Sequence, residues 1–314
     1  MIKEDTVFIL GAGASCPYGL PDGSGLRKQI YERFAHNLSH YYERNPPKPS
    51  ENLLSQAKLF SRTFENSNTR SIDLFLSRNN EFMEIGKLAI IFSIISSELN
   101  SRFREHINNR DHDWYSHIFD KLTDHIIKKE DYKLFSQNKA SFITFNYDRS
   151  LDHFLFEGLL NSFYGIDPIE IKKMMDNLNI IHLFGQVAGL DWQDLESKIA
   201  YKTSVDNIDI NKLVKNLRII YEVEDDPILE KACDKISKAK RIFFLGFGYA
   251  PENLKVLKLP EILNTGMRVY GTAFGLIENE VNQKRVTFAP SLGLDYKYVN
   301  IHAVDSLMLL RQFL

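Results

Sequence analysis

Cysteine is scarce in this sequence, which has only Cys16 and Cys233 among its 314 residues. The two lie far apart and form none of the closely spaced pairs that bind zinc, so a disulfide scaffold and a cysteine-rich zinc site are excluded. Long hydrophobic runs are scarce as well. The longest, LAIIF followed by SII at 88–95, is shorter than the about 20 residues that a membrane-spanning helix needs.

An excess of charge of either sign is also missing. The chain has 39 Lys and Arg against 41 Asp and Glu, a net charge of −2, which excludes a general attraction of the whole surface to nucleic acid or to anionic membranes. Its opening, MIKEDTVFIL, contains acidic residues and only four consecutive apolar ones, unlike a secretory signal peptide. We therefore expect a cytoplasmic protein without a membrane partner and without direct nucleic-acid binding.

Short apolar runs rich in β-branched and aromatic residues indicate strands, and helical patterns separate several of them. A strand is expected at TVFIL (6–10), and later ones at ASFITF (140–145), LNIIHLF (178–184), RIFFLGFG (241–248), MRVYGTAF (267–274) and YKYVNIHA (296–303). Strands that alternate with helices are typical of a parallel sheet. The sequence therefore predicts an α/β fold with a Rossmann-like parallel sheet, in one domain over 1–314.

The first strand is separated from the others by a long region with few strand signals. Residues 26–138 read as mostly helical, interrupted by the proline cluster RNPPKPS at 44–50, which no regular element tolerates. We expect this region to be a helical insertion within the fold. Its most apolar part, 81–103, suits one long buried helix, which packs either within the insertion or against a second protein chain.

Glycines follow two of the predicted strands. Gly11 and Gly13 begin the stretch GAGASCPYGLPD, and Gly246 and Gly248 lie in GFGYAPEN. Such turns bring backbone amides against a pyrophosphate, but the full fingerprint is G-x-G-x-x-G, and Cys16 stands where the third glycine belongs in the first turn. Each turn alone fits a tight connection without a ligand. Two of them at the carboxyl ends of parallel strands favour a nucleotide.

Polar residues follow two further strands, in ITFNYDRSLD and NIIHLFGQ. Asp148 suits a helix cap, whereas Asn146 comes too early in the chain for that role. His182 is either a hydrogen-bonded core residue or a catalytic one. Because the carboxyl ends of parallel strands meet at one edge of the sheet, these side chains and the glycine turns are expected to face the same crevice.

Taken together and in order, these motifs resemble the sirtuin family, and in particular its zinc-free, sirtuin-like bacterial branch. GAGASCPYGLPD is similar to the family's G-A-G-x-S and G-x-P-D segment, TFNYD to the segment with the catalytic Asn, IHLFG to that with the catalytic His, and FLGFGYAPEN to the later glycine turn. Three features depart from sirtuin deacylases. Gly23 and Ser24 replace Phe-Arg, the zinc-binding cysteines are missing, and the helical insertion is placed differently.

The resemblance implies that NAD is the substrate, that no zinc is needed, and that NAD is hydrolysed to nicotinamide and ADP-ribose by a regulated effector of anti-phage defence. It implies a homo-oligomer, or a sensor or ATPase subunit as partner. Asn146 and His182 would be catalytic, with His182 the general base. NAD would be bound by the amides of Gly11, Ala12 and Gly13, the Ser15 hydroxyl, Asp22 and Asp148 near the nicotinamide, and Gly246, Gly248 and Asn253 at the adenosine ribose. The alternatives are an NAD-dependent protein deacylase, an ADP-ribosyl transferase, or a nucleotide-binding sensor without catalysis.

Overall fold

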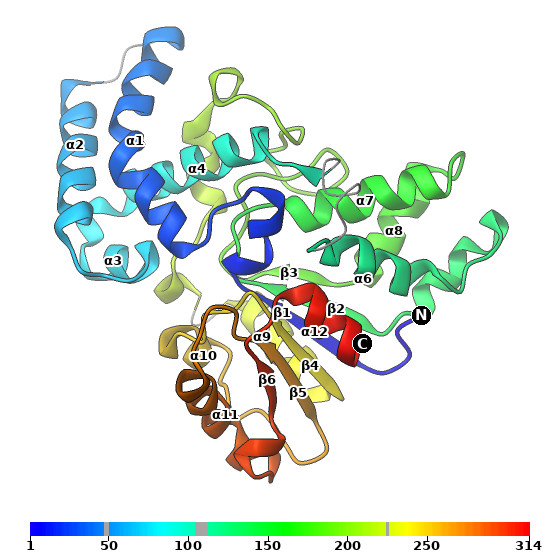
Figure 1. Ribbon diagram of the computed structural model, residues 1–314. Helices are drawn as coiled ribbons and strands as arrows, with labels where there is room; N and C mark the ends of the chain where they lie inside the picture. The colour runs from blue at the N-terminus through cyan, green and yellow to red at the C-terminus, as the bar shows by residue number, and fades with distance from the viewer. Residues whose placement is uncertain (47–49, 104–111, 224–225) are drawn as a thin grey trace.

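The computed structural model describes residues 1–46, 50–103, 112–223 and 226–314, and its centre is a sheet of six parallel strands (Figure 1). The strands are β1 (Thr6–Leu10), β2 (Ala140–Thr144), β3 (Ile180–His182), β4 (Arg241–Leu245), β5 (Arg268–Thr272) and β6 (Asn300–His302). Their order in the sheet is β3-β2-β1-β4-β5-β6. From the central β1, the chain adds β2 and β3 on one side of the sheet and then β4, β5 and β6 on the other. This is the doubly wound order of a Rossmann-like fold. The predicted fold class is therefore confirmed.

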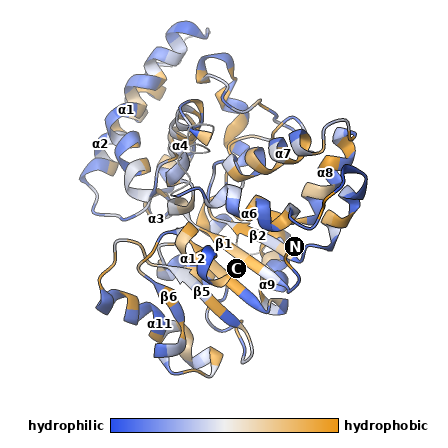
Figure 2. Cartoon of the chain, turned by 45° about the vertical axis from the view of Figure 1, so that its right-hand side comes forward, coloured by the Kyte–Doolittle hydropathy of each residue, from blue (hydrophilic) through white to orange (hydrophobic). Residues whose placement is uncertain are grey.

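Both faces of the sheet are covered, which explains why the strands read as uninterrupted apolar runs. Every residue of β1 is buried, and its side chains alternate between two clusters. Val7 and Ile9 belong to one, whereas Phe8 and Leu10 belong to the other. The ring of Phe8 stacks on that of Phe142 on β2, with centroids 4.9 Å apart. Figure 2 shows the strands as the hydrophobic centre of the molecule.

The described helices form a layer on each face and a separate group. They are α1 (Gly23–Arg44), α2 (Glu51–Asn66), α3 (Ile72–Arg78), α4 (Met83–Leu99), α6 (Trp114–Thr123), α7 (Ser150–Ser162), α8 (Pro168–Asn177), α9 (Pro227–Lys238), α10 (Pro251–Val256), α11 (Glu278–Leu292) and α12 (Ser306–Phe313). Helices α6, α7, α8 and α12 share the cluster of Phe8, and α9, α10 and α11 share that of Val7. Among the described helices, none is long and apolar enough to cross a membrane.

Helices α1 to α4 form a bundle at one end of the molecule (Figure 1). The expected long helix over 81–103 is α4, in which 13 of 17 residues are buried. It contacts α1, α2 and α3, so its apolar surface is covered within this chain. All four helices and α6 lie between β1 and β2, where the insertion was predicted, although α6 packs beside the sheet against α7 and α12. Of the proline cluster, 47–49 lie outside the described residues, and α1 and α2 end and begin on either side of it.

The segment from β3 to α9 has neither an α-helix nor a strand in its described part, 183–223. It contains short 3₁₀ turns, two of which, Val205–Asn207 and Ile210–Asn216, pack against α4. The sequence predicted no element here, because the segment shows neither helical nor strand periodicity. It carries the chain from His182 around the helical bundle and back to the sheet.

Candidate functional site at the carboxyl ends of the strands

The two glycine turns pack directly against each other. The amide of Gly11 donates to the carbonyl of Leu245 at 3.0 Å, and that of Gly13 donates to the carbonyl of Gly246 at 3.0 Å. A Cβ on Gly11 would lie 2.6 Å from the Gly246 oxygen, so only glycine permits this approach. The amides of Gly11 and Gly13, which were predicted to hold the pyrophosphate, therefore already have backbone acceptors. Within the turn, the Ala12 amide alone donates to no acceptor in the described part of the chain.

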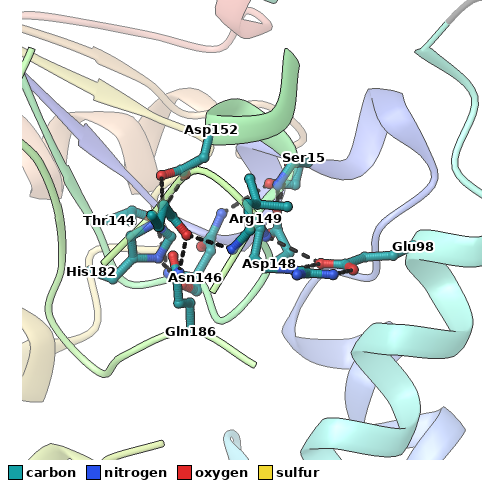
Figure 3. A network of polar contacts seen from close by, with 12 residues as sticks. Ser15, Glu98, Thr144, Asn146, Asp148, Arg149, Asp152, His182 and Gln186 are labelled. Carbon is teal, nitrogen blue, oxygen red and sulfur yellow. Dashed lines mark hydrogen bonds and ion pairs between the residues drawn. The ribbon is translucent and has the colours of Figure 1, made fainter. Parts of the chain in front are cut away.

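Asn146 lies where the carboxyl ends of β1 and β2 meet. Its Nδ2 donates to the carbonyl of Gly11 and to the hydroxyl oxygen of Ser15, each at 3.1 Å, and its backbone amide donates to Thr144 Oγ1 at 3.0 Å (Figure 3). The residue is only 9% exposed. Its Oδ1 is buried and has no hydrogen-bond partner among the described residues. The amide is thus held in one orientation that leaves its acceptor atom free.

His182 ends β3 and lies beside Asn146. Its Nε2 is 3.0 Å from Asp152 Oδ2, and its Nδ1 is 3.3 Å from the Asn146 carbonyl oxygen (Figure 3). The other oxygen of Asp152 accepts from Gln193 Nε2 at 3.0 Å, and Gln193 in turn accepts from Gln186. Burial opposes the charged form of the imidazole, but the Asp152 carboxylate and these hydrogen bonds outweigh it and raise the pKa of His182.

The two predicted nicotinamide-binding aspartates both accept hydrogen bonds where helices begin. Asp22 is the N-cap of α1, whereas Asp148 lies one residue before Arg149, the N-cap of α7. Asp148 Oδ1 accepts from the amide of Ser150 at 3.0 Å at the start of α7, and Asp22 Oδ1 accepts from the amide of Gly25 at 2.6 Å at the start of α1. Capping was the alternative left open for Asp148. Desolvation of the Cys16 thiol, followed by the charges of Asp22 and Asp148, raises the pKa of Cys16 to about 11. Both carboxylates therefore lie near the glycine turn, and the thiol between them stays protonated at neutral pH.

The loop that carries Asn146 is fixed by contacts from the helical bundle. Tyr147 donates a hydrogen bond to Asp73 at the start of α3. Arg149 forms an ion pair with Glu98 near the end of α4, with Nη2 and Oε2 2.7 Å apart and both side chains 1% exposed. The Arg149 backbone amide also donates to Glu98, at 3.3 Å. Burial raises the pKa of Glu98, although Arg149 opposes that shift.

Arg149 also holds the segment that follows His182. Its Nη1 donates to the carbonyls of Gly189 and Ile199, at 3.1 and 2.6 Å. A single guanidinium therefore connects α4, the loop of Asn146, and the irregular segment beyond β3. Figure 3 shows this side chain extended from the Asn146 loop toward Glu98.

A cavity of about 710 Å³ lies along the outer edge of β3. His182, Asp152 and Gln186 are among its lining residues, whereas the glycine turns are not. Gln186 is buried, and its Oε1 has no hydrogen-bond partner among the described residues. The cavity therefore opens on the side of His182 away from the two glycine turns.

Hydrogen bonds and close backbone contacts join most of the predicted site. They connect Gly11, Gly13, Ser15, Asn146, His182 and Gly246. Gly248 is exposed beyond Gly246, and Asn253 is half-buried in the first turn of α10. Among the described residues, no hydrogen bond joins Gly248 or Asn253 directly to Asn146. Within the described ranges, no group of three or more His, Cys, Asp or Glu side chains is arranged to hold a metal ion.

Sequence reasoning missed three residues that hold the site together. Asp152 lies four residues after Asp148, in the first turn of α7, so its spacing from Asp148 offered a signal. Arg149 stands in the same quoted segment, but nothing in its neighbours marks it as buried. Glu98 is 51 residues distant in the chain, and no local pattern relates it to Arg149.

Comparisons with known proteins add a similarity of fold. No protein-family model and no curated protein matches the sequence. Solved structures of Sir2 proteins do match. A Sir2 variant with a deacetylated p53 peptide and 3'-O-acetyl ADP-ribose is 17% identical, with a TM-score of 0.42 and coverage of 98% of this chain and 91% of that chain.

Two further matches are complexes with NAD. A Sir2–p53 peptide–NAD+ complex is 17% identical, with a TM-score of 0.39 and coverage of 98% and 90% of the two chains. A Sir2 homolog–NAD complex is 14% identical, with a TM-score of 0.39 and coverage of 85% and 77%.

Proposed function

We propose that the protein binds NAD across the carboxyl ends of β2, β1 and β4 and hydrolyses it to nicotinamide and ADP-ribose. The observation that carries the proposal is the buried side chain of Asn146. Its Nδ2 is fixed by Gly11 and Ser15, while its Oδ1 has no partner within the part of the chain that the structure describes. A buried acceptor without a donor costs roughly 1–3 kcal/mol. A ribose hydroxyl or the attacking water would supply that donor.

The order of the motifs gives the orientation of NAD. The amide of Ala12, which has no acceptor among the described residues, and the hydroxyl of Ser15 lie just after β1, where they suit the pyrophosphate. Asn146 and His182 lie on the β2 and β3 side and suit the nicotinamide ribose. The turn of Gly246 and Gly248 lies on the opposite side, and we assign it to the adenosine. The resemblance of these four motifs to sirtuins is what selects NAD among dinucleotides.

Hydrolysis breaks the bond between the nicotinamide nitrogen and the ribose carbon. The bonding electrons leave with nicotinamide, positive charge develops on the ribose, and a water oxygen forms the new bond. Asn146 Oδ1 accepts a hydrogen bond from that water or from a ribose hydroxyl. Neutral His182 donates its Nε2–H to Asp152 and takes the proton of the water at Nδ1. Nδ1 lies 3.3 Å from the Asn146 carbonyl oxygen, which can accept a hydrogen bond from the new Nδ1–H.

The proposal is tested by incubating the purified protein with NAD and separating nicotinamide from ADP-ribose by chromatography. We expect Asn146→Ala to lower turnover by about 10²–10³, and His182→Gln to lower it by about 10²–10⁴. His112 offers a matched control, because it also pairs with an aspartate, Asp305, at 2.9 Å but is 62% exposed. His112→Gln should leave turnover unchanged.

Other products would point to the alternatives. NAD that is bound but never cleaved would favour a nucleotide-binding sensor. Nicotinamide release only with an acylated peptide or another acceptor would favour a deacylase or a transferase. If calorimetry detects no NAD binding, the assignment of NAD is wrong.

The wider role that we propose is that of a regulated effector of anti-phage defence, as the motif resemblance implies. An unregulated NAD hydrolase would deplete its own cell, so activity should appear only on infection. Cells that carry the gene should lose NAD after phage infection, and cells with Asn146→Ala should not. NAD loss without infection, or none with it, would contradict this role. A partner subunit or a homo-oligomer would supply the control, and light scattering of the purified protein tests the oligomer.

A further inference from the structure

Phe274, at the carboxyl ends of the strands, differs in its exposure from the other phenylalanines of this chain. The chain has 22 phenylalanines, all within the described residues, and only Phe274 among them is exposed. Phe274 follows the end of β5 by two residues and is 75% exposed. A single exposed apolar side chain needs no explanation by itself. The position of Phe274 next to the second glycine turn, however, suggests a role in ligand binding.

The turns after β4 and β5 are held side by side. Thr272, the last residue of β5, accepts a hydrogen bond at Oγ1 from the amide of Gly246 at 2.9 Å and another at its carbonyl from the Tyr249 hydroxyl at 3.0 Å. The amide of Ala273 donates to the His302 carbonyl at 2.7 Å. The backbone that carries Phe274 is therefore fixed on both sides, beside the turn that we assign to adenosine.

Space is open at two glycines in the turns after β4 and β5. A Cβ added to Gly248, or to Gly275, would meet no atom within 4 Å. This contrasts with Gly246, where a Cβ would lie 1.9 Å from a backbone nitrogen. The backbone at Gly248 and Gly275 is thus not packed against other elements, and Phe274, which precedes Gly275, is itself exposed.

The orientation of NAD in the proposed function decides which half of the molecule would reach this ring. Asn146 and His182 place the nicotinamide ribose at the ends of β2 and β3, and the sheet order places β5 three strands away from β2. That separation is about 14 Å at the usual strand spacing, which an extended dinucleotide can cross. The half that extends toward β5 carries the adenine.

We propose that Phe274 stacks against the adenine ring of the dinucleotide and thereby contributes to the affinity for its adenosine half. This inference rests on the proposed binding of NAD, since the position of the nicotinamide end orients the ligand. Aromatic side chains bind bases face to face and tolerate different bases that present a flat ring. An exposed, flat, apolar ring at a fixed turn has the geometry that such stacking needs.

Calorimetric titration of Phe274 variants with ADP-ribose, AMP and nicotinamide mononucleotide tests the inference. Phe274→Ala should weaken ADP-ribose and AMP about tenfold or more, with no change for nicotinamide mononucleotide, which lacks adenine. Phe274→Trp should retain the affinity because it keeps a flat ring. Tyr298 is a matched control, because it is 70% exposed but lies before β6, at the amino-terminal ends of the strands. Tyr298→Ala should leave all three affinities unchanged.

The outcomes separate this inference from the proposed function. If the unchanged protein cleaves NAD and Phe274→Ala binds ADP-ribose and AMP as tightly, the stacking role is wrong and the hydrolase proposal stands. If NAD is not cleaved but AMP binds and Phe274→Ala loses it, the hydrolase proposal fails and the stacking role stands. If the unchanged protein binds neither AMP nor ADP-ribose, the inference is overturned.

Discussion

The imidazole of His182 shows how its neighbours set the charge of a buried group. Both of its hydrogen-bond partners, the Asn146 carbonyl and the Asp152 carboxylate, are acceptors, so each ring nitrogen can donate a proton when the imidazole is charged. The pKa of His182 is raised because the Asp152 interactions outweigh burial. A raised pKa means that the pair stabilises the fold fully below the ordinary pKa of about 6.5 and loses this contribution as the pH rises through the raised value.

Activity should have the opposite dependence on pH. A general base must be neutral, so kcat/KM should rise as the pH passes through the raised pKa of His182. We predict that Asp152→Asn lowers that pKa and moves the acidic limb of the profile to lower pH. The measurement is kcat/KM for NAD between about pH 5 and 9, the range in which histidine titrates. An acidic limb that stays in place in Asp152→Asn would show that another group controls it.

The glycines of the second turn permit a matched comparison of stability. Gly246 has a φ of +56°, and a Cβ there would overlap the backbone of Ala14, whereas Gly248 has open space around it. We predict that Gly246→Ala lowers the free energy of unfolding by at least about 1–3 kcal/mol, and that Gly248→Ala changes it by less than about 1 kcal/mol. Denaturant unfolding measures both. Equal stability of the two variants would contradict the close contact of the turns.

At the scale of elements, α4 reaches the site through one buried ion pair. Removing one partner of such a pair leaves an uncompensated charge, so Glu98→Ala should cost about 3–5 kcal/mol of unfolding free energy. Replacing both partners by apolar residues is often neutral. We therefore expect Glu98→Leu combined with Arg149→Met to be less destabilising than Glu98→Ala, with the remaining cost coming from the carbonyls of Gly189 and Ile199 that Arg149 also holds.

The double variant separates stability from positioning. Because Arg149 also holds the carbonyls of Gly189 and Ile199, its loss should release both segments that carry the site. We expect the folded double variant to bind NAD and to turn it over more slowly, with kcat reduced more than KM is raised. Unchanged kcat in a stable double variant would show that the pair serves folding alone.

An element could be predicted where neighbouring residues in the sequence determine it, and not where contacts between distant segments do. The strands are local apolar patterns, so each predicted run contains the strand that the structure shows. The carboxyl ends of parallel strands share an edge, and this rule placed Asn146 and His182 together correctly. The contacts of Glu98 and Asp73 depend on how the bundle packs over the sheet, and no local pattern encodes that packing.

The same limit applies to the glycine turns. The glycines of these turns predicted that another group approaches the backbone closely, but not whether that group is a ligand or another turn of the chain. In the structure the second turn makes it, because β4 lies next to β1 in the sheet. The amides of Gly11 and Gly13 are thereby used within the chain, and this follows only from the strand order.

At the scale of the whole molecule, the sheet order assembles groups that are far apart in the chain. The first turn, the Asn146 loop, His182 and the second turn come together at one edge because β3, β2, β1 and β4 are consecutive in the sheet. The helical bundle fixes that edge from α3 and α4, through Asp73 and Glu98. A signal that moves the bundle would therefore reach the Asn146 loop directly.

The rate of nicotinamide release from NAD, compared between the unchanged protein and Asn146→Ala at saturating and at low NAD, tests the central claim most directly. The account predicts that the unchanged protein releases nicotinamide and ADP-ribose in equal amounts, and that Asn146→Ala still folds and binds NAD but is slower by about 10²–10³. Equal rates in the two proteins would contradict the account, as would the absence of any release under conditions that activate the protein.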